Sequence, residues 1–364
     1  MEKFQRCSRC VMDNRSDTFI HFNEAGECNY CTSALSKIGT TSYFPGESGK
    51  QKLDEMLAML KREGQGKKYD CAMGISGGLD SSYLAYLGHK WGLRIMAVHI
   101  DDGYDTEISK SNIKKLVEAA GIDMYTIAPD SKQFNALTLA YMKAGVPNLA
   151  VPQDNILFAF LYEKMMEFGV KYFLTGVNFS LECILQQGNT HPALDLVNIK
   201  DIHKRFGTEP IDKLKFVSSY KKYWRQKTGK LITLSPLNYI DYRRDIAFKE
   251  LYDFCGFEYY GSKHLENTLT AFIQLYWFPK KFGVDKRTSH LSSMIVSGQM
   301  TRDEALKELE KPLYDEKQMD NYIEIVLKGL GITRAELDAI MAAPTHQHDE
   351  YKTDKIGELI HKII

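Results

Sequence analysis

Short apolar runs alternate with amphipathic segments between Tyr69 and Leu237. Runs of this length and content are typical of buried β-strands, and apolar residues at helical spacing fill the segments between them. The strands are expected at 71–75, 94–100, 124–128, 172–175 and 230–234, and the helices at 84–91, 106–120, 133–144 and 155–168. This alternation predicts an α/β fold with a mostly parallel five-stranded sheet and helices on both of its faces.

The chain beyond residue 240 has helical periodicity. Asp241 is expected to cap the first helix of this part. Two capping boxes, in which a threonine is followed three residues later by a glutamate, predict later helix starts. The boxes pair Thr301 with Glu304 and Thr333 with Glu336. We expect 241–364 to form a C-terminal helical region that serves substrate binding, partner binding or homo-oligomer formation.

A glycine- and serine-rich turn, Ser76 to Ser82 (SGGLDSS), separates the first strand from its helix. Glycine allows the backbone to turn tightly and to approach a ligand. The free N–H groups and the dipole of the following helix favour an anion. The serine hydroxyls add donors, and the Asp80 carboxylate suits Mg²⁺ bridging phosphate oxygens. The turn lacks the glycine spacing and the Lys-Ser/Thr end of a Walker A loop. The residues expected to hold phosphate are Ser76, Gly77, Gly78, Asp80, Ser81 and Ser82.

Two further strand ends carry candidate ligand-binding residues. In a parallel sheet, ligands bind beyond the carboxyl ends of the strands. The second strand runs into Asp101-Asp102-Gly103 and the fourth into Gly176-Val177-Asn178. The two aspartates could equally be solvated turn residues.

Two CxxC pairs lie in the first 40 residues, 17 residues apart. This spacing is typical of one tetrahedral four-sulfur site. A segment this short cannot form a core alone, so a structural Zn²⁺ would stabilise it, and an iron–sulfur cluster is the minor alternative. The expected ligands are Cys7, Cys10, Cys28 and Cys31.

These features divide the chain into four parts. We expect a zinc-ribbon-like module at 1–40, a linker with one helix at 41–66, the sheet domain at 67–240 and the helical region described above. Residues 179–229 interrupt the strand–helix pattern and are interpreted as an insertion. The insertion contains a basic, aromatic stretch at 220–230 that could bind RNA or a nucleotide, or form a solvated helix face with buried aromatic side chains.

The composition argues against two classes of protein, those that hold long nucleic acids and those that span membranes. The 364 residues are 44% hydrophobic and 26% charged, with a formal net charge of zero. A neutral chain lacks the basic footprint of proteins that hold long nucleic acids. No apolar signal segment begins the sequence, and no apolar run is long enough to cross a membrane. Four of the seven cysteines have metal-site spacing. This favours a reducing, cytoplasmic location.

Five cationic or histidine side chains lie between residues 280 and 290, next to apolar Phe282 and Val284. They could form a solvated face, or they could neutralise phosphates. They are Lys280, Lys281, Lys286, Arg287 and His290.

The SGGLDSS turn resembles the phosphate loop of the N-type ATP pyrophosphatases, the PP-loop family. Together with CSRCVMDN, the later CNYC and the string KKFGVDKRTSHLSSMIVSGQMTRDEAL, it makes nearly the whole chain similar to the N-acetyl sugar amidotransferases of the WbpG/PseA/LegA type. The resemblance implies a sheet of the PP-loop/adenine nucleotide alpha hydrolase type. It also implies that His99 and Asp101 lie near the nucleoside of ATP, and that Gly176 and Asn178 lie near its α-phosphate.

The same resemblance implies an activity. Family members are implicated in converting the acetamido group of a nucleotide-activated bacterial surface sugar into an acetamidino group, for O-antigen, lipopolysaccharide or flagellar glycans. ATP would adenylate the acetamido oxygen, with AMP and pyrophosphate as products. Catalytic roles would fall on Asp80, Lys281, Lys286 and Arg287. The expected substrate-binding residues are Lys263, His264, Glu266, Lys286, Arg287 and His290.

The sequence contains no glutaminase signature. We therefore expect a separate glutaminase, with a cyclase-like subunit, to supply ammonia. The main alternative is a tRNA-thiolating PP-loop enzyme, for which Cys183 is the candidate sulfur carrier because Cys71 lies in a strand. A second alternative is a nucleotide-binding scaffold without turnover.

Overall fold

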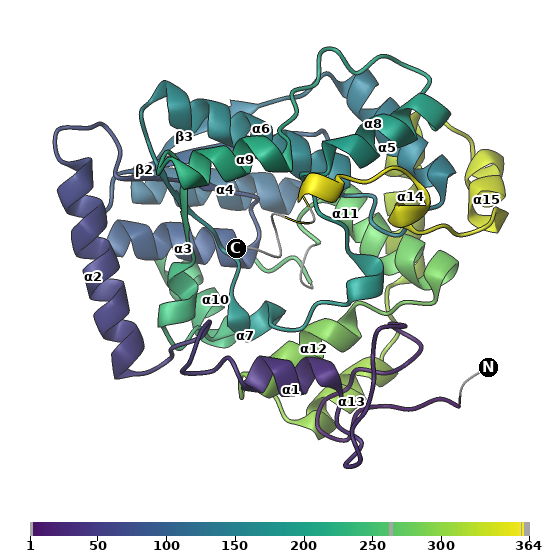
Figure 1. The fold of residues 1–364 in the computed structure, drawn as a ribbon, viewed down its shortest axis with the longest axis horizontal. Coiled ribbons are helices and arrows are strands. Elements are labelled where there is room, and N and C mark those ends of the chain that lie inside the picture. Colours follow the sequence, from purple (N-terminus) through teal and green to yellow (C-terminus); the bar gives the residue numbers. More distant parts are fainter. Residues whose placement is uncertain (1–2, 262–264, 358, 360–364) are drawn as a thin grey trace.

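A computed structural model describes residues 3–261, 265–357 and 359 of the chain (Figure 1). At its centre is a sheet of five parallel strands in the order β3-β2-β1-β4-β5. The strands are β1 Cys71–Gly74, β2 Ile95–Ile100, β3 Asp123–Ile127, β4 Tyr172–Leu174 and β5 Ile232–Leu234. The predicted α/β fold is confirmed, with strand ends within two residues of those expected.

The order of the strands reverses beside β1. The chain adds β2 and β3 on one side of β1, and then returns to place β4 and β5 on the other side. A reversal of this kind leaves a crevice beyond the carboxyl ends of the two neighbouring strands. The SGGLDSS turn follows β1, so it lies at this crevice.

Helices cover both faces of the sheet (Figure 1). One face is covered by a cluster that joins Leu60, Leu84, Leu116 and Leu251. These residues belong to α2 Glu47–Gly64, α3 Leu79–Lys90, α4 Glu107–Ala120 and α10 Arg244–Cys255. On the other face, Leu161 of α6 (Val151–Glu167) packs with residues of β1, β2 and β4.

A second hydrophobic core holds the remaining helices together. It joins Phe134, Trp277 and Ile323, which lie far apart in the sequence. Its helices are α5 Ser131–Ala144, α8 Leu196–Phe206, α11 Thr268–Phe272, the π-helix η3 Ile273–Phe282, α14 Glu316–Leu330 and α15 Arg334–Ala342. Both capping boxes are present as predicted, at the starts of α13 (Arg302–Glu310) and α15. The predicted cap at Asp241 is wrong, because α10 follows Arg243, which makes no side-chain capping bond.

The region expected to be an insertion contributes short helices. They are α7 Phe179–Glu182, η1 Gln187–Asn189, α8 and α9 Ser219–Lys227. The α9 helix buries none of its residues, and Tyr220 and Trp224 are about half exposed, at 54% and 48%. The expectation that its aromatic side chains are buried is therefore wrong.

The N-terminal cysteine segment packs on the C-terminal helices rather than standing apart. Its helix α1 (Asn29–Leu35) lies beside α12 (Arg287–Val296), as Figure 1 shows. Val11 N donates to Ser292 Oγ at 3.1 Å. Arg302 donates to the carbonyl oxygens of Cys7 and Cys10 at 3.0 and 3.1 Å. None of the helices in the described part of the chain combines the length and apolar content of a membrane span.

Candidate functional site

The SGGLDSS turn forms the floor of a cavity. Gly77 has φ +77°, a conformation that side chains rarely adopt, and a Cβ at this position would collide with Ser109. Ser81 Oγ lies 3.2 Å from Ser76 Oγ, and Ser76 Oγ accepts the N–H of Gly78 at 3.2 Å. The hydroxyls and the helix start therefore face one point, as an anion cradle requires.

Asp80 lies in the first turn of α3 and is held from behind. Buried Tyr242 donates its hydroxyl to Asp80 Oδ1 at 2.5 Å. Glu182, at the end of α7, lines the same cavity as Asp80. Carboxylate oxygens beside a phosphate cradle are the ligands that Mg²⁺ prefers, so two carboxylates in the lining of this cavity fit this ion.

The cavity has a volume of about 560 Å³, within the range of small-molecule sites. Its walls come from the SGGLDSS turn, the residues after β4, α7, α10, α12 and the chain after α13. The polar and charged side chains in these walls are Ser76, Asp80, Ser81, Glu182, Arg244, Tyr259, Tyr260, Glu266, Arg287, His290, Glu308 and Lys311.

Several predicted site residues meet in this cavity. Ser76, Gly78, Asp80, Ser81 and Gly176 line its floor. Gly176 is needed there, because a Cβ would lie 3.2 Å from the N atom of Ser81. The carboxylate of Glu266 reaches the cradle, since a Cβ at Gly78 would lie 2.5 Å from Glu266 Oε1. Arg287 and His290 come from α12 on the opposite wall.

Arg287 is fixed in position. Its guanidinium pairs with Asp285 at 2.8 Å and donates to the carbonyl oxygens of Glu308 and Lys311 at 3.2 and 3.0 Å. These bonds join α12 to the end of α13. Arg287 therefore shapes the cavity wall as well as placing a positive charge beside it.

Three predicted phosphate-site residues do not line this cavity. Ser82 is fully buried under the turn. Gly77 shapes the turn without lining the cavity. Asn178 caps α7, with its Oδ1 accepting the N–H of Leu181 at 2.9 Å and its amide donating to the carbonyl of Gly176 at 3.1 Å. These residues position the cradle rather than contact its contents.

The predicted catalytic lysines lie elsewhere. Lys281 Nζ donates to the carbonyl oxygens of Ile340 and Ala343 at 2.7 and 2.8 Å, so it caps the end of α15. Lys286 lies 5.4 Å from the ring of Phe278, and burial lowers the pKa of its ammonium to about 8. Neither lysine lines the cavity. The structure thus contradicts the catalytic positions predicted for both lysines, because Lys281 of the π-helix η3 binds the end of α15 and Lys286 packs on Phe278.

His99 and Asp101 lie in a separate groove of about 300 Å³ between α4 and β3. Both ring nitrogens of His99 are engaged, Nδ1 with the Ile75 carbonyl at 2.8 Å and Nε2 with Asp105 at 2.9 Å. Burial opposes protonation of His99, but Asp105 and the Ile75 carbonyl outweigh it and raise its pKa. These residues therefore lie apart from the main cavity, and the position beside the nucleoside that the resemblance implies for them stays a prediction. Lys263 and His264 lie outside the described residues.

Six of the polar and charged side chains in the cavity walls were not predicted from the sequence: Glu182, Arg244, Tyr259, Tyr260, Glu308 and Lys311. Glu182 follows the end of β4 by a few residues. Its signal is therefore the same strand-end position that pointed to Gly176 and Asn178. Arg244 and Tyr260 gave no sequence signal. Tyr260 accepts the N–H of Leu79, the first residue of α3, at 2.8 Å. This bond brings a distant tyrosine into the anion cradle.

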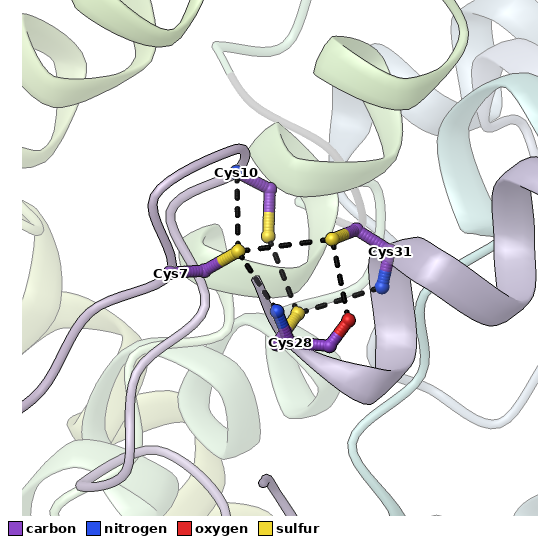
Figure 2. Close-up of side chains that lie close together, drawn as sticks. All are labelled: Cys7, Cys10, Cys28 and Cys31. Atoms are coloured by element: carbon purple, nitrogen blue, oxygen red, sulfur yellow. Dashed lines mark hydrogen bonds between the residues drawn. The ribbon is translucent and has the colours of Figure 1, made fainter. Parts of the chain in front are cut away.

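The four N-terminal cysteines form a compact buried cluster (Figure 2). Cys7 Sγ lies 3.7 Å from Cys31 Sγ, and Cys10 Sγ lies 3.6 Å from Cys28 Sγ. A tetrahedron with Zn–S bonds of about 2.3 Å has sulfur–sulfur edges of about 3.8 Å. Backbone N–H groups of Cys10 and Cys28 point at Cys7 Sγ, at 3.4 and 3.2 Å. The geometry fits a structural zinc. Within the described residues it is the only group of three or more His, Cys, Asp and Glu side chains whose ligand atoms lie close enough together to hold a metal ion.

Cys183 does not line the cavity. Its sulfur packs against the cysteine module and lies 4.0 Å from the Ser293 carbonyl. Burial raises the pKa of this thiol to about 11. It is therefore protonated at neutral pH, which opposes a role as a nucleophilic sulfur carrier.

A known protein family matches the C-terminal part of the chain. Residues 266–363 match the model of the "LPS biosynthesis protein WbpG-like, C-terminal domain". Among curated proteins, an uncharacterized protein of Methanocaldococcus jannaschii is 23% identical over 329 residues, 90% of this chain and 100% of that protein. A tRNA-specific 2-thiouridylase (MnmA 2) of Thermoanaerobacter sp. strain X514 is 33% identical over 123 residues, 29% of this chain and 34% of the thiouridylase.

Two solved structures are similar at low sequence identity. The NMN synthetase of Francisella tularensis is 13% identical, covers 83% of this chain and 99% of its own, and has a TM-score of 0.35. The NH3-dependent NAD synthetase of Campylobacter jejuni subsp. jejuni NCTC 11168 is 14% identical, covers 50% of this chain and 84% of its own, and has a TM-score of 0.31.

Proposed function

Because this chain carries a WbpG-like C-terminal domain after a PP-loop sheet, as its resemblance to the WbpG-type family implied, we propose that it is an ATP-dependent N-acetyl sugar amidotransferase. It would act on a nucleotide-activated acetamido sugar of lipopolysaccharide or another surface glycan. The product would be the corresponding acetamidino sugar, with AMP and pyrophosphate released.

One observation carries this proposal. The phosphate cradle and the WbpG-like domain share a single cavity. Ser76, Asp80 and Ser81 form one side of it, and Glu266, Arg287 and His290 of the domain form the other. An enzyme that activates a substrate with ATP needs the α-phosphate and the substrate within bonding distance.

The residues of the cradle suit cleavage of ATP between the α- and β-phosphates. Backbone N–H groups at the start of α3 and the hydroxyls of Ser76 and Ser81 would hold the departing pyrophosphate. Mg²⁺ on Asp80 and Glu182 would neutralise phosphate charge when bound. Arg287, held by Asp285, would place a positive charge next to the transferring group.

The chemistry requires no side-chain nucleophile. The acetamido oxygen attacks the α-phosphorus, the bond from that phosphorus to the β-phosphate oxygen breaks, and pyrophosphate leaves. The result is an O-adenylyl imidate. Ammonia then attacks the imidate carbon, and the carbon–oxygen bond breaks to release AMP. The nitrogen of ammonia remains as the second nitrogen of the amidine, so no oxidant or reductant is consumed.

We propose that the ammonia comes from a separate glutaminase, with a cyclase-like subunit. The chain has no glutaminase motif of its own in its sequence. Free ammonium salts should therefore replace the partner in a purified system, at high concentration.

A tRNA-thiolating activity is the second candidate, favoured by the partial match to a tRNA-specific 2-thiouridylase. That match spans about a third of the thiouridylase. The buried, protonated thiol of Cys183 weighs against it. The formal net charge of zero lacks the overall basic footprint of proteins that hold long nucleic acids.

The test is product analysis by mass spectrometry. The protein would be incubated with ATP, Mg²⁺, ammonium chloride and a panel of UDP- and CMP-linked diacetamido sugars. Replacing C=O by C=NH lowers the sugar mass by about one unit, and AMP and pyrophosphate should form in equal amounts. Asp80→Asn and Glu182→Gln should each abolish this product. Glu324→Gln, an exposed glutamate on α14, is the matched control.

Two results would overturn the proposal. One is the absence of a mass change with every sugar. The other is tRNA-dependent AMP release with sulfur incorporated into the tRNA. A fully active Cys183→Ser variant in the sugar assay would exclude the sulfur-carrier role.

A further inference from the structure

A second groove opens beside the main cavity. It has a volume of about 830 Å³ and lies along α10. Four residues line both spaces, so the groove adjoins the cavity that contains the phosphate cradle. They are Arg244, Phe248, Tyr259 and Met294. The activity proposed above does not by itself use the rest of this groove.

One face of α10 supplies most of its wall. Arg244, Phe248 and Tyr252 follow each other at intervals of four residues, which places them on one side of a helix. All three line the groove, together with Arg243 and Lys249. Tyr252 is 66% exposed, so its ring is accessible from the groove.

The groove carries three cationic side chains, of which Arg244 also lines the main cavity. Arg244 is held there by its bond to the Tyr259 hydroxyl at 2.7 Å, with its guanidinium 5.5 Å from the ring of Phe248. Lys249 has no ion-pair partner in the described part of the chain. Arg243 pairs weakly with exposed Asp245 at 3.5 Å. Glu258, the other acidic residue of the groove, is already paired with Lys115 at 2.5 Å.

Aromatic rings line the same groove. Phe248 and Tyr259 lie where it meets the main cavity, and Tyr252 lines the groove alone. Phe248 and Tyr259 pack edge to face with their ring centres 4.9 Å apart. With Tyr252 they offer flat surfaces of the kind on which nucleobases stack. Arginine and lysine beside such rings are the usual means of binding phosphate next to a base.

We propose that this groove binds the nucleoside diphosphate that carries the sugar, with the diphosphate on Arg243, Arg244 and Lys249 and the base on the tyrosines. The inference rests on the proposed function, and it adds that the carrier is a diphosphate such as UDP rather than a monophosphate such as CMP. The sugar would then extend past Arg244 into the main cavity, with its acetamido group at the cradle.

The experiment is a calorimetric titration of UDP into the protein saturated with α,β-methylene-ATP and Mg²⁺, so that the phosphate cradle is filled. CMP is titrated in parallel. The variants are Arg243→Gln with Lys249→Gln, and Tyr252→Ala, all at exposed or half-exposed side chains. The control is Lys317→Gln with Lys328→Gln, which removes two charges from exposed positions on α14.

UDP should bind the wild type more tightly than CMP. The double groove variant should weaken UDP binding by about tenfold or more, because charge-assisted phosphate bonds are lost. Tyr252→Ala should weaken it by a smaller factor, and the control should not change it. Binding of α,β-methylene-ATP should be the same in all variants.

Three results would overturn the inference: no binding of UDP to the wild type, equal binding by wild type and groove variants, or displacement of UDP by the ATP analogue. The sugar assay separates this failure from failure of the proposed function. If acetamidino product forms with unchanged KM in the groove variants, the groove assignment is wrong and the chemistry stands. If UDP binds at the groove but no sugar reacts, the groove assignment stands and the chemistry is wrong.

Discussion

Tyr242 donates its hydroxyl to the carboxylate of Asp80 across 2.5 Å, although 162 residues separate them. Tyr242 is buried between Tyr83 and the phosphate turn, with the two tyrosine rings stacked at 5.5 Å. Asp80 has two oxygens, and this bond engages one of them. The same contact fixes the orientation of the whole carboxylate. Tyr242 therefore sets the direction in which the second oxygen of Asp80 would face Mg²⁺.

Tyr242→Phe should therefore impair the ATP reaction without unfolding the protein. A hydrogen bond to a charged group contributes about 1.5–3 kcal/mol, so a loss of roughly tenfold to a hundredfold in pyrophosphate release is expected. The loss should be partly restored by raising the Mg²⁺ concentration. Tyr83→Phe, which removes a neighbouring hydroxyl bonded to Glu250 at 3.2 Å, is the control. Equal activity of wild type and Tyr242→Phe at low Mg²⁺ would contradict this role.

The sequence predicted those parts of the site that are made locally. The SGGLDSS turn needs only the strand before it, the helix after it and glycine at Gly77, so its conformation follows from neighbouring residues. The cysteine cluster is likewise encoded by two short motifs. The capping boxes at Thr301 and Thr333 are fixed by one turn of helix each.

The opposite wall of the cavity could not be predicted in this way. Whether a lysine in the 280–290 segment faces a phosphate or a helix end depends on tertiary packing. In the π-helix η3, ten residues long, the side-chain directions differ from those of an α-helix. Lys281 thus caps α15, while Arg287 and His290 reach the cavity from α12. Arg244 enters it because α10 packs against α3, and Tyr260, beyond the end of α10, is held there by its bond to Leu79. Sequence periodicity carries no signal for either contact.

The position of Lys281 at the end of α15 predicts a structural role for this lysine instead of a catalytic one. Lys281→Met should leave the KM for ATP and the rate of pyrophosphate release unchanged, because the ammonium does not line the cavity. It should lower the melting temperature, since carbonyl oxygens at the end of α15 lose their donor, at a cost of about 1–3 kcal/mol. Lys280→Met provides the neighbouring control. A large loss of activity in a stable Lys281→Met protein would restore the catalytic assignment.

Stability should depend on pH through His348. This side chain is 4% exposed, and its ring stacks on that of His191 at 4.3 Å. Burial, followed by the charge of His191, lowers its pKa to about 2. A histidine in the unfolded chain has a pKa of about 6.5. Below that pH the unfolded chain takes up a proton at His348 that the folded chain does not. The contribution of the buried, neutral His348 to the free energy of unfolding is therefore present above pH 6.5 and is lost as the pH falls.

The expected loss is about 1.4 kcal/mol per pH unit below the unfolded pKa, or about 2 kcal/mol between pH 6.5 and pH 5. Chemical denaturation at pH 7 and pH 5 would measure it. His348→Gln should remove this part of the difference, whereas His346→Gln, at a half-exposed position paired with Glu350, should retain it. Identical pH dependence of wild type and His348→Gln would show that the buried ring is not its source.

The cysteine cluster should hold one zinc ion per chain, and loss of this ion should disturb the wall of the active-site cavity. Cys10→Ser removes one of four ligands, and structural zinc in small modules supplies much of their folding free energy. The module contacts α12 through Ser292 and α13 through Arg302, and α12 carries Arg287 and His290. Metal analysis should therefore find less than one zinc in Cys10→Ser, with a lower melting temperature and slower pyrophosphate release.

Cys255→Ser, which changes a cysteine outside the cluster, should keep the metal and the activity. Bound iron with visible absorbance in the wild type would instead identify an iron–sulfur cluster, and a Cys10→Ser protein with full zinc and full activity would separate the module from the site.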